Sequence, residues 1–184
     1  MINNEKLENE KLLYYNYGKF VSEFKHLILS VKICISSIMT IKKLSDPEYL
    51  RVILNDQTAK PLLSKLQTLI SIYWKDLPDK IKILEKMFNY TSIIIERRNE
   101  VIHGSIFYIS QKKAFLFKDK TNKSGLNPIE EYIDASLLLK QTEKVIKTKE
   151  MFEMLNSYLN QNDDNLFDYF FRKEKIDALN INSK

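Results

Sequence analysis

Apolar residues recur at three- and four-residue steps along the first part of the chain. Between about Glu5 and Lys43 this spacing places one apolar stripe along a helix, made of Phe20, Phe24, Leu27, Ile28, Val31, Ile35, Ile38 and Met39. The pattern therefore predicts one long first helix, with a break near Gly18.

Start and stop signals divide the next segment into further helices. Ser45-Asp46-Pro47 supplies a cap followed by a proline in the first turn, and Pro61 marks another start. Leu77-Pro78-Asp79 interrupts the pattern again. From Asp79 to His103 the helical period returns, and Gly104 is its expected stop.

The pattern changes after this glycine. Ser105 to Ile109 and Ala114 to Phe117 are short runs of β-branched and aromatic residues on either side of a polar tetrapeptide, which predicts a β-hairpin. The polar residues 118–128 predict a surface loop.

A last long helix is expected from about Asp134 to Asn160. The aromatic residues 166–171 are expected to belong to the core, with a docking helix or a dimer contact as the alternatives. Only three glycines and four prolines occur in 184 residues, which favours helices. We therefore predict a mainly α fold and a single helical domain over residues 1–184, with the hairpin and loop at about 105–128 and an aromatic tail at about 163–184.

Composition bears on the partners and the compartment. The formal charge of +5 suits an anionic partner, although a solvated lysine-rich surface explains it as well. The single cysteine, Cys34, lies in an apolar run, so a buried thiol and a reducing compartment are expected. The N-terminus lacks a secretory signal pattern, and the apolar tract from Leu27 to Ile41 is shorter than a bilayer requires. We expect a cytoplasmic protein with no membrane partner.

Most classes of site lack the residues that they need. One cysteine and two histidines, His26 and His103, do not supply a zinc site, so we expect no metal and no cofactor. The three glycines are isolated, which excludes Gly-rich phosphate loops. His26 has no candidate partner and is expected to be structural or on the surface.

One polar cluster, residues 96–100, interrupts the apolar helix before His103. At 100° per residue Glu96, Asn99 and His103 fall on one face, and Arg98 lies about 140° from His103. A histidine exchanges protons near neutrality and a guanidinium holds phosphate oxygens, which suits attack of a ribose 2′-hydroxyl on the adjacent phosphate without a metal. The same residues also suit the solvated face of an ordinary helix.

The segment from Glu96 to Gly104 resembles the hallmark of the HEPN superfamily, which is an arginine, a polar residue, three further residues and a histidine. The segment from Tyr17 to Phe24 also resembles the opening helix of stand-alone members. The resemblance covers about residues 12–160. It implies an α-helical bundle, usually dimeric, in which the motifs of two subunits meet across a cleft. It also implies a metal-independent endoribonuclease of a toxin–antitoxin, CRISPR or anti-phage system.

This resemblance gives each residue an expected role. His103 would be the general acid/base or a phosphate contact, Arg98 would bind the scissile phosphate, and Asn99 would orient them. Arg97 and Glu96 are further candidates for substrate contacts, with a surface or ion-pair role as the alternative for Arg97.

The expected partners are RNA, a second copy of the chain, and an antitoxin or defence-system protein. Toxins regulated by nucleotidyl transfer carry a tyrosine two residues after the histidine, where this chain has Ser105, so that regulation is not expected. Two alternatives stay open: a catalytically inactive module that binds RNA or protein, and a structural helical partner in a larger complex.

Overall fold

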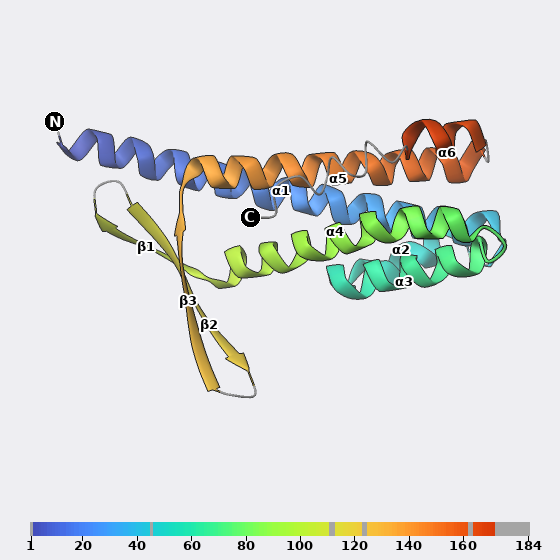
Figure 1. Cartoon of the computed structure of the whole chain (residues 1–184), viewed down its shortest axis with the longest axis horizontal. Helices are drawn as coiled ribbons and strands as arrows, with labels where there is room; N and C mark the ends of the chain where they lie inside the picture. The colour runs from blue at the N-terminus through green and yellow to red at the C-terminus, as the bar shows by residue number, and fades with distance from the viewer. Residues whose placement is uncertain (1, 45, 111–112, 123–124, 162–163, 172–184) are drawn as a thin grey trace. The chain divides into compact units, whose positions relative to one another are not determined.

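The computed structural model describes residues 2–44, 46–110, 113–122, 125–161 and 164–171, and it is mainly helical, which confirms the predicted class (Figure 1). The end of the predicted aromatic tail, residues 172–184, lies outside the described residues. The elements are α1 (Ile2–Ile41), α2 (Pro47–Asn55), α3 (Ala59–Tyr73), α4 (Pro78–His103), β1 (Ser105–Ser110), β2 (Lys113–Asn122), β3 (Gly125–Ile133), α5 (Ala135–Gln161) and α6 (Asp164–Phe170).

The chain forms two compact units, each made of two separate stretches. The sheet unit comprises Met1–Phe24 and Glu96–Val145, and the helical unit comprises Lys25–Ile95 and Ile146–Lys184. Helices α1, α4 and α5 contribute residues to both units. The single domain stays a prediction.

Apolar stripes of α1, α3, α4 and α5 build much of the core of the helical unit. Fully or almost fully buried side chains include Leu27, Val31, Ile38, Leu62, Leu66, Ile70, Leu84, Met87, Phe152 and Leu155. Cys34 belongs to this core, because it is 0% exposed and its thiol donates to the carbonyl oxygen of Phe152 at 3.2 Å. Burial raises the pKa of the Cys34 thiol far above its ordinary value. The predicted buried thiol is therefore confirmed.

Helix starts follow the predicted signals, but the predicted break in α1 is wrong. Asp46 caps α2 by accepting a hydrogen bond from the Glu48 backbone N–H at 2.8 Å, and Pro47 lies in the first turn. Helix α1 continues through Gly18. A glycine in a helix interior costs only about 1 kcal/mol, and the buried Leu13 and Phe20 on the flanking turns outweigh that cost.

The aromatic residues at the end of the described chain pack into the helical unit. Phe167 and Phe171 are each 1% exposed, which confirms their predicted place in the core, whereas Tyr169 lies at the surface. The Phe167 ring contacts Trp74 and Tyr158, with centroid distances of 5.7 and 5.2 Å. Helix α6 is thereby held against α3 and α5.

A lysine network closes over these rings. The Lys80 ammonium donates to the Asp164 carboxylate and to the Tyr158 hydroxyl, and that hydroxyl donates to Asp164 at 3.0 Å. Burial lowers the pKa of Lys80, but its hydrogen bonds to Asp164 and Tyr158 outweigh burial, so the pKa is raised overall. The hydrogen bonds from Lys80 and then Tyr158 lower the pKa of Asp164.

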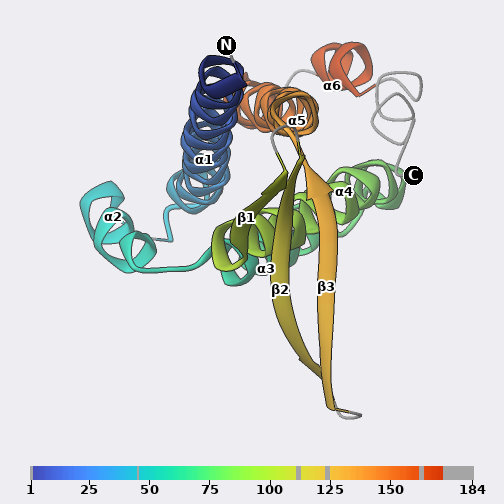
Figure 2. The same ribbon diagram turned by 90° about the vertical axis from the view of Figure 1, so that its left-hand side faces the viewer.

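The sheet unit contains an antiparallel three-stranded sheet in the order β1-β2-β3. Ser105 pairs with Phe117 at one end of the β1–β2 ladder, which confirms the predicted hairpin. The predicted loop at 118–128 is wrong, because β2 extends to Asn122 and β3 begins at Gly125. Figures 1 and 2 show β2 and β3 leaving the helices of this unit as an arm, which explains why an extended segment has a polar sequence.

Gly104 ends α4 as predicted, but the reason differs from the expected one. Its φ is not in the left-handed region, and its N–H donates to the Glu100 carbonyl at 2.9 Å. A Cβ at this position would lie 2.5 Å from Leu116 Cδ1 and 2.8 Å from the Glu100 oxygen. The chain needs glycine here because β2 packs directly against the helix end.

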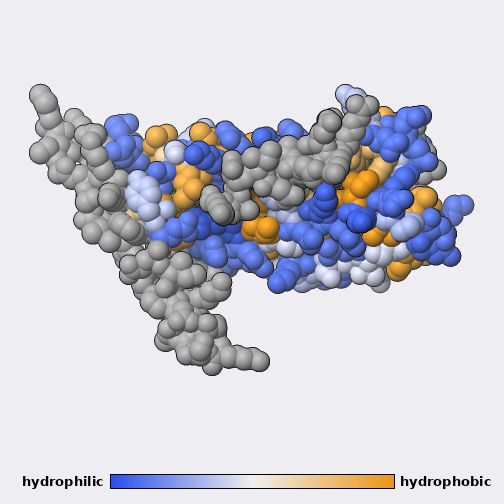
Figure 3. All heavy atoms as spheres, in the orientation of Figure 1, coloured by the Kyte–Doolittle hydropathy of each residue, from blue (hydrophilic) through white to orange (hydrophobic). Residues whose placement is uncertain are grey.

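Helix α1 is longer than the apolar tract suggested. By length and composition its residues Leu7–Ile41 are able to cross a membrane, and 39% of the apolar window is buried inside the protein. A core helix of a soluble protein meets the same criteria. On the face drawn in Figure 3 the coloured residues mix hydrophilic and hydrophobic types over the helices. The cytoplasmic location stays a prediction.

Substitution of the two glycines is expected to have opposite effects. Gly104→Ala should lower the free energy of unfolding by about 1–3 kcal/mol, because the methyl group meets Leu116 and backbone. Gly18→Ala, with nothing within 4 Å of the added Cβ, should raise it by about 0.5–1 kcal/mol. Urea unfolding followed by circular dichroism measures both, and equal effects would contradict the close contact at Gly104.

The stability that α6 draws from Asp164 should depend on pH. The lowered pKa of Asp164 means that its contribution is present above the ordinary value of 3.8 and is lost as the pH falls through the folded-state value. Trp74, the single tryptophan, packs on Phe167 and reports docking by fluorescence. The difference in Tm between wild type and Asp164→Asn should therefore be largest at neutral pH and should vanish in acid. A difference that is constant with pH would refute the ion pair.

Candidate functional site

The polar cluster lies on the last turns of α4, where the sheet unit begins. Ile94, Ile95 and Val101 are at most 4% exposed and hold the helix against its neighbours. The polar residues between them are exposed or half-buried. The apolar positions therefore fix the helix while the polar ones reach its accessible sides.

His103 is the last residue of α4, and it is exposed. Within the described ranges its imidazole takes part in no hydrogen bond and no ion pair. Both ring nitrogens are therefore available to a ligand or to a second chain.

Arg98 is half-buried and is held by two neighbours. Its guanidinium carbon lies 5.3 Å from the centroid of the Phe24 ring on α1, and its Nη1 donates to Asn99 Oδ1 at 3.0 Å. Phe24 itself is 5% exposed. This contact is a cation–π interaction, which orients the guanidinium plane without neutralising its charge.

The charge of Arg98 is uncompensated, and one of its donors is unsatisfied. Among the described residues no carboxylate forms an ion pair with Arg98, and its Nε is buried without a hydrogen-bond partner. A buried unsatisfied donor costs about 1–3 kcal/mol. An anion that accepts from this guanidinium would therefore be favoured.

The structure brings some of the predicted site residues together and separates others. The side chains of Arg98 and Asn99 are hydrogen-bonded to each other. In the part of the chain that is described, no hydrogen bond joins either side chain to His103. Five residues of helix place Arg98 and His103 about 7.5 Å apart along the axis. Glu96 is exposed and forms no ion pair with another described residue.

Arg97 has a different environment from its neighbour. Its Nη2 donates to Glu131 Oε1 at 3.0 Å, and its Nη1 donates to Glu131 Oε2 and, at 3.3 Å, to Glu100. The ion-pair alternative for Arg97 thus matches the structure, and the pair ties β3 to α4. No pattern in the sequence pointed to Glu131 as its partner, because the two residues are 34 positions apart.

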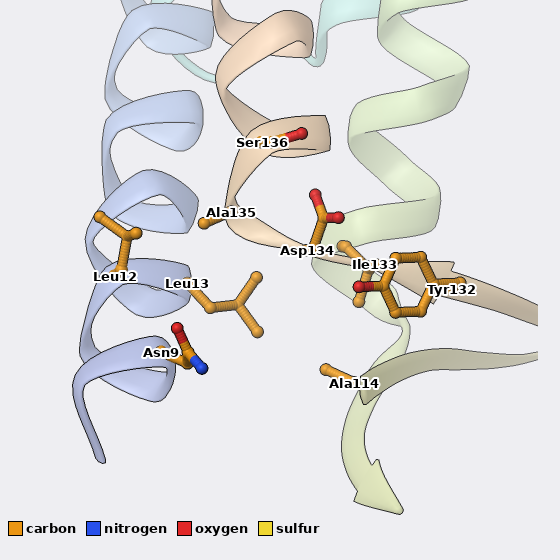
Figure 4. A pocket seen from close by; sticks show the side chains of 9 residues that line it. All are labelled: Asn9, Leu12, Leu13, Ala114, Tyr132, Ile133, Asp134, Ala135 and Ser136. Atoms are coloured by element: carbon orange, nitrogen blue, oxygen red, sulfur yellow. The ribbon is translucent and has the colours of Figure 1, made fainter. Parts of the chain in front are cut away.

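A pocket of about 260 Å³ opens where α1, β2, β3 and the start of α5 meet (Figure 4). Leu12, Leu13, Ala114, Ile133 and Ala135 form its apolar wall, with Asn9, Tyr132, Asp134 and Ser136 as its polar lining.

The carboxylate in this pocket already accepts a hydrogen bond from the first turn of α5. Asp134 caps α5 by accepting from the Leu137 backbone N–H at 2.7 Å. Burial raises the pKa of Tyr132, and the charge of Asp134 and a hydrogen bond to it add to this effect.

Among the described residues no group of three or more histidine, cysteine, aspartate or glutamate side chains is placed to hold a metal ion. The chemistry at the end of α4 is that of a cation and an imidazole. Comparison with protein-family models, with curated proteins and with solved structures finds no match for this chain.

Removal of the Arg97 guanidinium should destabilise the sheet unit. Arg97→Ala removes a side chain that is 14% exposed and leaves the Glu131 and Glu100 carboxylates without this partner, so we expect a loss of about 1–2 kcal/mol in unfolding free energy. Lys11→Ala removes the exposed pair with Glu8 and should change stability by less than about 0.5 kcal/mol. Urea unfolding compares the two, and an unchanged midpoint for Arg97→Ala would show that the pair is not stabilising.

Proposed function

We propose that this chain is a HEPN-type, metal-independent endoribonuclease that acts as a homodimer in toxin–antitoxin or anti-phage defence. One observation carries the proposal: the end of α4 presents a guanidinium without an ion pair, Arg98, and an exposed imidazole without a partner, His103, among the described residues. A buried polar group is usually hydrogen-bonded, so the unsatisfied Nε of Arg98 favours a ligand that accepts from this side chain, and the exposed imidazole of His103 is accessible to a ligand as well.

The two groups have complementary roles in cleavage of a phosphodiester. His103 takes the proton of the ribose 2′-hydroxyl, and the 2′-oxygen forms a bond to phosphorus. The bond from phosphorus to the 5′-oxygen breaks, and an imidazolium gives that oxygen its proton. Arg98 donates to the non-bridging oxygens as negative charge develops on them. The products are a 2′,3′-cyclic phosphate and a 5′-hydroxyl.

A second copy of the chain would supply the second imidazole that the reaction needs. Arg98 and His103 lie on different faces of one helix, about 7.5 Å apart along its axis. Two copies that face each other at the end of α4 would place one imidazole on each side of the scissile phosphate. One would act as base and the other as acid.

Asn99 has a positioning role in this proposal. Its Oδ1 accepts from Arg98 Nη1 at 3.0 Å, and the Phe24 ring also contacts the guanidinium. These two contacts limit the rotamers of Arg98, so less entropy is lost when a phosphate binds.

RNA cleavage in the presence of a chelator tests the proposal. Wild type should produce 2′,3′-cyclic phosphate ends, and His103→Ala should lower the rate by about 10²- to 10⁴-fold. His26→Ala, which removes the other exposed histidine, should cleave at the wild-type rate. Sedimentation of the same samples should show a dimer.

Two outcomes would contradict the proposed ribonuclease activity. One is intact RNA with wild type at every protein concentration, and the other is equal cleavage by wild type and His103→Ala. RNA that is bound but never cut would favour the non-catalytic binding module.

A further inference from the structure

The covered face of the β-sheet carries a carboxylate beside the end of α4. Ala114, Leu116 and Ile133 on this face are at most 4% exposed. Glu131 pairs directly with Leu116 across the β2–β3 ladder, so the two side chains lie on the same face. Because Leu116 packs against Gly104 at the helix end, Glu131 lies one strand away from that contact.

This carboxylate occupies the terminal nitrogens of Arg97. Nη1 and Nη2 of Arg97 both donate to Glu131, and Nη1 also donates to Glu100 at 3.3 Å. A guanidinium offers the same two-point arrangement of donors to two oxygens of a phosphate. The Glu131 carboxylate is therefore placed where the oxygens of an anionic ligand would bind to Arg97.

The next residue of the helix has no such carboxylate. Among the described residues Arg98 forms no ion pair, and its Nη1 donates to Asn99 at 3.0 Å. Two guanidinium groups thus follow each other near the end of α4, one paired with carboxylates and one not. Because a nucleic acid strand carries a phosphate at every nucleotide, a cation released beside Arg98 would bind a neighbouring phosphate.

The position of Glu131 permits its exchange for another anion. Its side chain is 41% exposed, whereas that of Arg97 is 14% exposed. A carboxylate that leaves Arg97 therefore has access to water and does not become an unpaired buried charge. The contact of Leu116 with Gly104 involves neither charged group, so the sheet keeps this attachment to the helix end.

We propose that Arg97 is a second phosphate-binding residue of this chain, and that Glu131 keeps it closed until an RNA phosphate displaces the carboxylate. The choice of RNA as the source of the phosphate rests on the proposed function. Arg98 binds one phosphate, and Arg97, once released, binds a neighbouring one. The ion pair is then an autoinhibitory contact, because RNA has to compete with an internal carboxylate for the guanidinium.

Removal of the competing charge tests this site. All variants carry His103→Ala, so that the RNA stays intact, and the probe is a fluorescent single-stranded oligoribonucleotide of mixed sequence. Glu131→Gln keeps the shape of the side chain but removes its charge. RNA affinity should rise about fivefold at low salt, and the slope of log affinity against log salt concentration should steepen by about 0.7, the value for one additional phosphate contact.

Two matched variants separate the release of Arg97 from a general change in charge. Glu8→Gln removes one negative charge from the exposed pair with Lys11 and should leave the affinity within about twofold of the parent. Arg97→Gln combined with Glu131→Gln should bind no better than Arg97→Gln alone, because the guanidinium to be released is missing.

A third variant guards against misfolding of Glu131→Gln. Glu131→Asp keeps the charge and shortens the side chain by one methylene, which weakens the two-point contact with Arg97. Its RNA affinity should lie between those of the parent and Glu131→Gln. Circular dichroism establishes that each variant is folded.

Three results would overturn the Arg97 site: folded variants at position 131 with parental or weaker affinity, an equal gain in Glu8→Gln, or a gain from Glu131→Gln that persists without Arg97. The test also separates this proposal from the ribonuclease. A gain that requires Arg97, in a chain whose wild type never cuts RNA, contradicts only the ribonuclease. Cleavage by wild type with no gain from Glu131→Gln contradicts only the Arg97 site.

Discussion

The close packing of β2 against the last turn of α4 is the constraint on which the sheet unit depends. Leu116 occupies the space that any side chain at position 104 would need, so the chain turns from helix to strand within one residue. His103 is left at the junction, at the end of the helix and next to the first strand. The same packing brings Glu131 of β3 within reach of Arg97. The geometry of the candidate site and the placement of the sheet therefore have one origin.

Two adjacent arginines at the end of α4 have different environments. Successive helical residues point about 100° apart, so Arg97 and Arg98 meet different neighbours. Arg97 meets two carboxylates and becomes part of the framework, whereas Arg98 meets the face of Phe24 and keeps its charge. A cation held by an aromatic ring is oriented but still able to bind an anion.

Local patterns predicted most helices, because the apolar spacing and the capping residues of a helix involve only residues that are close in sequence. The missed strand β3 and the missed partner Glu131 depend on pairing with residues that are distant in sequence. Polar composition over residues 118–128 suggested a loop, since an arm that buries little has no apolar alternation to reveal it. Pro128 added to that impression, although an edge strand tolerates proline. The motif identified the end of α4 as the candidate site, but which arginine is available was decided by tertiary contacts.

The order of the strands leaves β1 and β3 as the two edges of the sheet. The β3 edge contains Pro128 and two glutamates, which disfavour pairing with another chain. The six residues of β1, Ser105–Ser110, carry no charge and no proline. An edge of this kind is a template for unwanted association at high concentration. Solubility of the protein is therefore linked to the segment that follows the histidine, and a bound ligand that masks this edge would act as a stabiliser in solution.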